Sequence, residues 1–171
     1  VANGTEAIHL SLRALGIKEG DEVITTPFTA VPTITAIEMT KATPIFVDVN
    51  SSTFNIDSSL IEEKITEKTK AVVVVHLFGQ PCEMDRIVDI AKKYNLKVIE
   101  DACQAHGAEF GSKKVGTFGE VGCFSFYPTK NLGGIGDGGA IITNHKEIAE
   151  KLLLLRNYGQ KEKYNHVEKG F

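Results

Sequence analysis

Residues 71–78, "AVVVVHLF", form a nearly continuous apolar run in which four consecutive valines follow Ala71. A strand with one face in water alternates polar and apolar side chains, whereas this run offers apolar side chains to both sides. Strands of this kind are buried on both faces, as happens when helices cover a sheet from both sides. The run therefore favours an α/β protein.

The segments around this run alternate between strand and helix patterns. Helix patterns cover 4–16, about 30–41, 57–65, 83–95 and 146–157, and strand patterns cover 21–26, 43–49, 97–102, 121–127 and 139–144. This alternation predicts a largely parallel sheet covered by helices, with ligands bound at the carboxyl ends of its strands. Because no repeat or low-complexity linker divides the chain, we expect one domain.

Composition is typical of a soluble globular domain. The chain has 171 residues, 42% of them apolar and 24% charged, and its net charge of -3 gives no indication of nucleic-acid or membrane binding. No apolar run is long enough for a transmembrane helix, and no signal-peptide pattern is present. The three cysteines form no C-x-x-C pair, so we predict no metal site or disulfide framework and a cytoplasmic location.

Both ends of the chain predict a fragment of a longer protein. The first three residues, "VAN", resemble the end of a strand, and the last five, "VEKGF", carry no stop signal. We therefore expect the fold to be truncated at both ends.

The segment "NGTEA", residues 3–7, predicts an anion site at the start of the first helix. Free N–H groups in a first helical turn, together with the Thr5 hydroxyl, suit a phosphate group. A plain capped helix would explain the same residues, and this alternative stays open.

The segment "VIEDACQAHG", residues 98–107, places Asp101 at the rim of the predicted sheet. A carboxylate there could hold a protonated ring nitrogen, although a helix cap or a solvated loop acid would also fit. Gln104 and His106 follow, and a single histidine in such a position is more often structural than catalytic.

The segment "FSFYPTKNLGGIGDGG", residues 124–139, holds Ser125 and Lys130. A lysine in a low-dielectric pocket becomes a usable amine nucleophile for Schiff-base chemistry, whereas a lysine that extends to the surface is the alternative. The glycines match G-x-G-x-x-G, but a strand pattern follows them where a dinucleotide site needs a helix, which argues against such a site. We expect them to supply positive φ angles and close backbone approach.

Taken together, these segments resemble the DegT-type nucleotide-sugar aminotransferases, a family of fold type I enzymes that depend on pyridoxal phosphate. The resemblance spans the chain in order and is carried by "NGTEA", "GDEVITTPFTA", "KAVVVVHLFGQPCEMD", "VIEDACQAHGA", "FSFYPTKNLGGIGDGGAI" and "LRNYGQ". It implies a three-layer αβα large domain with a mostly parallel sheet. By this likeness, residues 1–171 are an incomplete cofactor-binding domain, and the small C-terminal domain is absent.

The resemblance also implies a role for each candidate residue. Lys130 would form the internal aldimine with pyridoxal 5'-phosphate, Asp101 would pair with the pyridine nitrogen, and Gln104 would bind the ring hydroxyl. Four residues would hold the phosphate, namely Gly4, Thr5, the backbone of Glu6, and Ser125. One position departs from the family, because Ala30 stands where many members have an aromatic residue stacked on the ring, and Phe28 lies two residues away.

The implied reaction is transfer of an amino group, from glutamate in most of the family, to a nucleotide-linked keto-sugar. The sequence around Lys130 and the segment "LRNYGQKEKYNH" are more similar to members that aminate C3 of a dTDP-3-keto-6-deoxyhexose than to members that act at C4. Lys130 argues against the dehydratase branch, in which histidine replaces the lysine. The family implies a homodimer, and we expect residues 1–171 alone to be inactive. A catalytically inactive regulatory relative and a lysine-dependent lyase are the alternatives.

Overall fold

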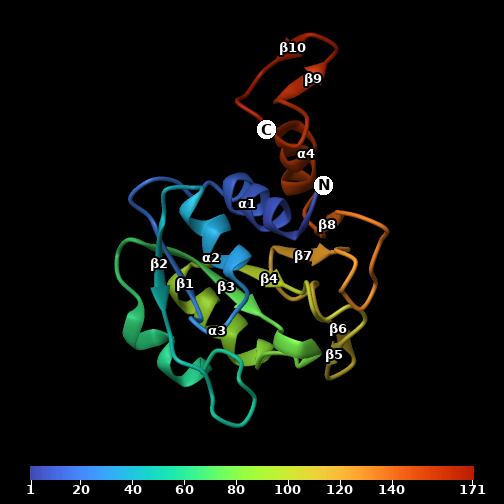
Figure 1. Ribbon diagram of the computed structural model, residues 1–171. Helices are drawn as coiled ribbons and strands as arrows, with labels where there is room; N and C mark the ends of the chain where they lie inside the picture. The colour runs from blue at the N-terminus through green and yellow to red at the C-terminus, as the bar shows by residue number, and fades with distance from the viewer.

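The computed structural model describes residues 1–171 and contains one six-stranded sheet with helices on both faces (Figure 1). The helices are α1 (Gly4–Ala14), α2 (Val31–Glu38), α3 (Met84–Tyr94) and α4 (Lys146–Leu155), with short 3-10 helices η1 (Ser58–Leu60), η2 (Glu62–Lys64) and η3 (Leu77–Gly79). The strands are β1 (Glu22–Thr25), β2 (Thr43–Phe46), β3 (Thr69–Val75), β4 (Lys97–Asp101), β5 (Glu109–Phe110), β6 (Lys113–Lys114), β7 (Val121–Ser125), β8 (Gly139–Ile142), β9 (Gln160–Glu162) and β10 (Asn165–His166).

The main sheet has the order β2-β1-β3-β4-β7-β8, and every neighbouring pair is parallel except β7 and β8. The predicted, largely parallel sheet is thus confirmed. Parallel strands all end at one edge of a sheet, so the last residues of β1, β3, β4 and β7 lie along the same edge. No helix in the structure has both the length and the apolar character needed to cross a membrane.

Strand β3 shows why the sheet is covered on both sides. Ala71 and Val73 pack in the cluster that includes residues of α1, α2 and α4, whereas Val72 and Val74 pack in the cluster that includes α3. Successive side chains of a strand point to opposite faces, so a run of apolar residues needs a helical layer on each side. The helices on the two faces of the sheet in Figure 1 therefore provide the cover that the valine run requires.

The predicted helix over 57–65 was wrong, since two short 3-10 helices occupy this segment. Asp57 does cap the segment, because its carboxylate accepts a hydrogen bond from the Ser59 N–H at 2.9 Å. The hydroxyls of Ser58 and Ser59 are bound to Glu83 and Asp57, respectively. Such local side-chain bonds compete with the regular helix pattern, and serine is a weak helix former.

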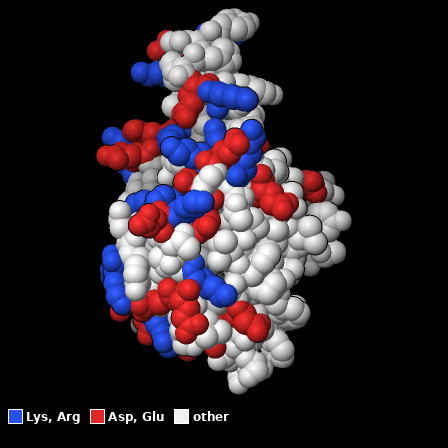
Figure 2. Space-filling view, turned by 90° about the vertical axis from the view of Figure 1, so that its left-hand side faces the viewer, with Lys and Arg blue, Asp and Glu red and all other residues white.

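Two antiparallel hairpins were not predicted, β5 with β6 and β9 with β10. The second hairpin extends with α4 away from the sheet, close to the C-terminus (Figure 1). On the face drawn in Figure 2, acidic and basic side chains are intermixed, and neither sign forms a continuous field. This distribution agrees with the small net charge of the sequence.

Candidate active site

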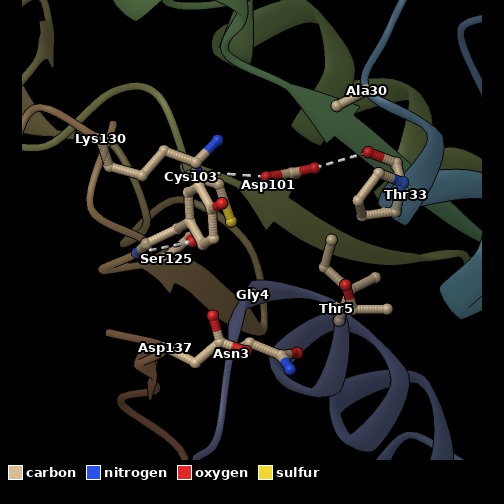
Figure 3. Close-up of a pocket in the computed structure, with 13 residues that line it drawn as sticks. Asn3, Gly4, Thr5, Ala30, Thr33, Asp101, Cys103, Ser125, Lys130 and Asp137 are labelled. Carbon is tan, nitrogen blue, oxygen red and sulfur yellow. Dashed lines mark hydrogen bonds between the residues drawn. The ribbon is translucent and has the colours of Figure 1, made fainter. Parts of the chain in front are cut away.

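A cavity of about 350 Å³ opens at the carboxyl edge of the sheet (Figure 3). Its volume lies within the usual range for small-molecule sites. The cavity brings together residues from four parts of the sequence: Asn3, Gly4, Thr5, Ile8, Ala30, Pro32, Thr33, Asp101, Cys103, Ser125, Tyr127, Lys130 and Asp137. Five of the seven predicted site residues are therefore neighbours in space.

The start of α1 forms one end of the cavity. The N–H groups of Gly4 and Thr5 donate no hydrogen bond within the chain, as the first positions of a helix allow. A Cβ atom on Gly4 would lie 2.9 Å from Ser125 Cβ and 2.9 Å from Cys103 Sγ, so glycine is required for this close approach. The result is a cradle of free N–H groups beside the Ser125 hydroxyl, which suits an anion such as phosphate.

Glu6 differs from the other residues predicted to hold the phosphate. Its N–H already donates to Asn3 Oδ1 at 2.9 Å, and its side chain accepts the N–H of Ala2. Glu6 is also absent from the cavity lining. Its role thus stays a prediction that would require the Asn3 cap to open.

Asp101 is the last residue of β4 and is only 5% exposed. Its Oδ1 accepts the N–H of Cys103 at 3.1 Å, and its Oδ2 accepts the hydroxyl of Thr33 at 2.8 Å. These two contacts fix the orientation of the Asp101 carboxylate on the cavity wall.

Lys130 lies in the turn that follows β7 and is half-buried. The turn is closed by the Lys130 N–H, which donates to Tyr127 O at 2.8 Å. Its side chain extends into the cavity toward Asp101 (Figure 3), and its amine takes part in no hydrogen bond or ion pair of the structure. An unpaired amine inside a cavity is the arrangement that a nucleophilic lysine needs.

Gln104 lies in an adjoining hollow, which it lines together with Phe78, Thr129, Lys130 and Asn131. Its Oε1 accepts the N–H of Phe78 at 3.0 Å. Lys130 lines both hollows, so Gln104 is near Lys130 without facing the main cavity.

His106 packs between the rings of Phe124 and Phe126, at centroid distances of 5.5 and 5.6 Å. Both ring nitrogens are buried without a hydrogen-bond partner. Burial, and after it the charge of Lys130, lowers the pKa of His106. Since His106 does not line the cavity, the structural interpretation is the better one.

The glycine-rich loop corrects one expectation. No glycine between residues 131 and 139 has a positive φ angle, so that predicted reason was wrong. The other reason is confirmed, because Cβ atoms on Gly133 and Gly139 would lie 2.4 Å from Pro128 O and Asn3 O, respectively. A strand, β8, follows the loop, as predicted.

The departure at Ala30 leaves the wall of the cavity without a ring at that point. Ala30 lines the cavity, whereas Phe28 packs against Phe54 at 6.0 Å and is not part of the lining. The aromatic side chain that does line the cavity is Tyr127.

The residues present fit a phosphorylated pyridine cofactor. Donors for a phosphate lie at one end, a buried carboxylate lies on the wall, and an unpaired amine extends toward that carboxylate. Sequence reasoning missed Thr33, whose contact with Asp101 spans 68 positions and follows from no local pattern. It also missed Cys103, although a carboxylate that accepts the N–H two residues later is a common local turn. Burial and the nearby charge of Asp101 raise the pKa of the Cys103 thiol, so this cysteine is not a nucleophile at neutral pH.

Comparison with known proteins gave consistent matches. The model of the DegT/DnrJ/EryC1/StrS aminotransferase family matches residues 1–171. The chain is 56% identical to a dTDP-3-amino-3,6-dideoxy-alpha-D-galactopyranose transaminase of Aneurinibacillus thermoaerophilus, covering 99% of this chain and 47% of the relative. It is 52% identical to a pleiotropic regulatory protein of Geobacillus stearothermophilus, covering 99% of this chain and 45% of that protein.

Among solved structures, S. venezuelae DesV in complex with a ketimine intermediate superimposes with a TM-score of 0.97 at 45% identity. The match covers 99% of this chain and 46% of DesV. The chain thus spans about half the length of the curated relatives that it matches.

Proposed function

This chain belongs to the DegT/DnrJ/EryC1/StrS aminotransferase family, and on that premise we propose that its protein is a sugar aminotransferase dependent on pyridoxal phosphate. The amino group would pass from an amino acid, glutamate, to a nucleotide-linked keto-deoxysugar. The observation that carries the proposal is the unpaired Lys130 amine, which shares one cavity with the buried Asp101 carboxylate and the Gly4–Ser125 cradle.

The residues that line the cavity, and Gln104 beside it, each have a proposed task in holding the cofactor. Lys130 would bind it covalently, Asp101 would pair with its ring nitrogen, and Gln104 would contact the ring hydroxyl. The phosphate would lie on the free N–H groups of Gly4 and Thr5, with Ser125. When bound, pyridoxal phosphate acts as the electron sink for the bond that breaks at the donor's α-carbon.

Lys130 is also the proposed general base and acid. Its Nζ would accept the proton that leaves the α-carbon of the amino donor and would later return a proton to carbon. Two features support this role: the amine has no competing partner in the chain, and its side chain reaches into the cavity. The Asp101 carboxylate is buried and bonded to Thr33 and Cys103, which would keep it in place on the cavity wall during this transfer.

We further propose a dTDP-3-keto-6-deoxyhexose as the substrate. The relatives named as transaminases of dTDP-3-amino-sugars, at 56% and 45% identity, support this choice. Residues 1–171 would be an incomplete large domain, inactive alone, within a cytoplasmic homodimeric protein that adds a small C-terminal domain. The coverage of about half of each relative supports this division.

A catalytically inactive regulator is the second candidate function. The match to a pleiotropic regulatory protein at 52% identity favours it. The two candidates differ in one chemical property, which is whether Lys130 reacts with the cofactor.

The test uses a full-length protein that contains residues 1–171. It is incubated with pyridoxal phosphate, reduced with borohydride and digested, and the modified peptide is identified by mass spectrometry. We expect a phosphopyridoxyl group on Lys130, its loss in Lys130→Ala, and its retention in Lys161→Ala, a matched control in the exposed β9 strand.

A label on another lysine, or none, would contradict the proposed aminotransferase and favour the regulator. If Lys130 is labelled, glutamate is then supplied with a panel of dTDP- and UDP-keto-sugars, and the amino-sugar products are identified. Activity with UDP-sugars alone would reject the dTDP-sugar substrate while leaving the aminotransferase in place.

A further inference from the structure

The cavity holds an anionic carboxylate and a lysine amine that do not pair. Asp101 and Lys130 line the same cavity, and the amine is directed toward the carboxylate (Figure 3). No ion pair nevertheless joins them. Opposite charges in a partly enclosed site attract strongly, so the contacts that restrain the carboxylate bear on whether the two groups pair.

Two donors hold Asp101 in place. The Cys103 N–H binds Oδ1 at 3.1 Å from the same loop, and the Thr33 hydroxyl binds Oδ2 at 2.8 Å from the first turn of α2. Rotation of the carboxylate about its last bond would break both contacts. Thr33 is 1% exposed, so water has little access to replace its hydroxyl.

A second hydroxyl fixes the direction of this contact. The oxygens of Thr29 and Thr33 lie 2.9 Å apart. A hydroxyl has one proton to donate, and an ionised carboxylate only accepts. Because Thr33 donates to Asp101, Thr29 must donate to Thr33, which gives a one-way chain of hydrogen bonds ending at the carboxylate.

We propose that Thr33 is a positioning residue that holds Asp101 apart from Lys130 and thereby keeps the lysine amine free to react. The contacts of Thr33 do not depend on the proposed function. Only the reason for keeping the amine free, which is its reaction with the cofactor, rests on that function. Without the Thr33 hydroxyl, Oδ2 loses its anchor, and the carboxylate can turn toward the Lys130 amine, which lies on the other side of Asp101 (Figure 3). Asp101 would then pair with it, and an amine held in an ion pair is a poorer nucleophile.

The experiment measures the reactivity of Lys130 in full-length protein without added cofactor. The protein is pulsed with acetic anhydride at neutral pH, and acetylation of each lysine is followed by mass spectrometry. We expect Thr33→Val to slow the acetylation of Lys130 by roughly tenfold, the effect of one charge-assisted hydrogen bond. Thr33→Ser keeps the hydroxyl and should restore the rate, and Thr33→Ala offers a second variant without it.

Two further variants separate positioning from general structural damage. Thr35→Val makes the same change in the same helix without touching Asp101 and should leave the rate unchanged. Asp101→Asn removes the charge that would capture the amine, so adding Thr33→Val to it should cause no further slowing.

Equal acetylation rates in wild type and Thr33→Val would overturn the inference. Slowing by Thr33→Val that persists beside Asp101→Asn would also overturn it, because the effect would not pass through Asp101. The acetylation assay needs no cofactor, so its result is independent of the borohydride test. The first decides the role of Thr33, and the second decides whether Lys130 binds the cofactor.

Discussion

Replacing Glu100 with glutamine should destabilise the fold far more than a change of one atom indicates. Glu100 is fully buried, and its carboxylate accepts four hydrogen bonds. Oε2 accepts His76 Nε2 at 3.0 Å and the Gly116 N–H at 2.6 Å, and Oε1 accepts the N–H groups of Phe118 at 2.6 Å and Gly119 at 2.8 Å. The side chain thus ties β4 to the end of β3 and to the loop before β7.

The charge state of this cluster follows from its donors. His76 Nδ1 accepts the Cys82 N–H at 3.1 Å, so its proton must lie on Nε2 and be donated to Glu100. The histidine is therefore neutral and the carboxylate is ionised. Burial alone would raise the pKa of Glu100, but the hydrogen bonds from His76, Gly119 and Gly116 outweigh burial and hold this pKa below its ordinary value.

The expected cost follows from counting donors. Each oxygen of Glu100 faces two donors, and glutamine replaces one oxygen with an NH2 group that cannot accept. Two buried donors then lose their acceptor, and each costs about 1–3 kcal/mol. Glu100→Gln should therefore lower the free energy of unfolding at pH 7 by about 2–6 kcal/mol.

Urea unfolding followed by circular dichroism measures this change. Glu19→Gln is a suitable control, because Glu19 forms a mostly exposed ion pair with Lys41 and should cost less than about 1 kcal/mol. The pKa of Glu100 is lower in the folded state than in the unfolded chain, so its stabilisation is present above about pH 4.3 and is lost as pH falls further. A loss below about 1 kcal/mol for Glu100→Gln at pH 7 would refute the ionised, four-bond carboxylate.

Other positions give independent tests. Gly4→Ala places a Cβ against Ser125 and should weaken pyridoxal phosphate binding at least roughly tenfold, as measured by fluorescence titration. Gly136→Ala is the control, because open space surrounds Gly136, and it should leave the affinity unchanged. Equal affinities of the two variants would contradict the proposed phosphate cradle. Because burial lowers the pKa of His106 in the folded state, stability should fall as pH drops below about 6.5. His106→Phe should reduce that slope in chemical unfolding and leave the part due to His9, whose pKa burial also lowers. An unchanged slope would exclude His106 as its source.

Most of the architecture could be predicted from local patterns. The valine run after Ala71 required cover on both faces, because side chains of a strand alternate, and the structure provides it. The positions of Asp101 and Ser125 followed from the same reasoning, since parallel strands end at one edge of a sheet. Segment 57–65 failed because hydrogen bonds of its serines outweigh a helical pattern.

What the sequence by itself determined is which residues reach the carboxyl edge of the sheet, because periodicity is a property of consecutive residues. Only the tertiary structure decided which of them touch. Thr33 and Asp101 are 68 positions apart, and their hydrogen bond depends on where the first turn of α2 lies relative to the end of β4. The same holds for the four donors around Glu100, which all come from outside β4. The bond from the Glu6 N–H to Asn3 is by contrast a local helix cap, which the sequence already offered as an interpretation. A hydrogen bond tolerates only a few tenths of an ångström of change in the distance between donor and acceptor. When the two groups lie on separate elements, the packing of those elements sets that distance.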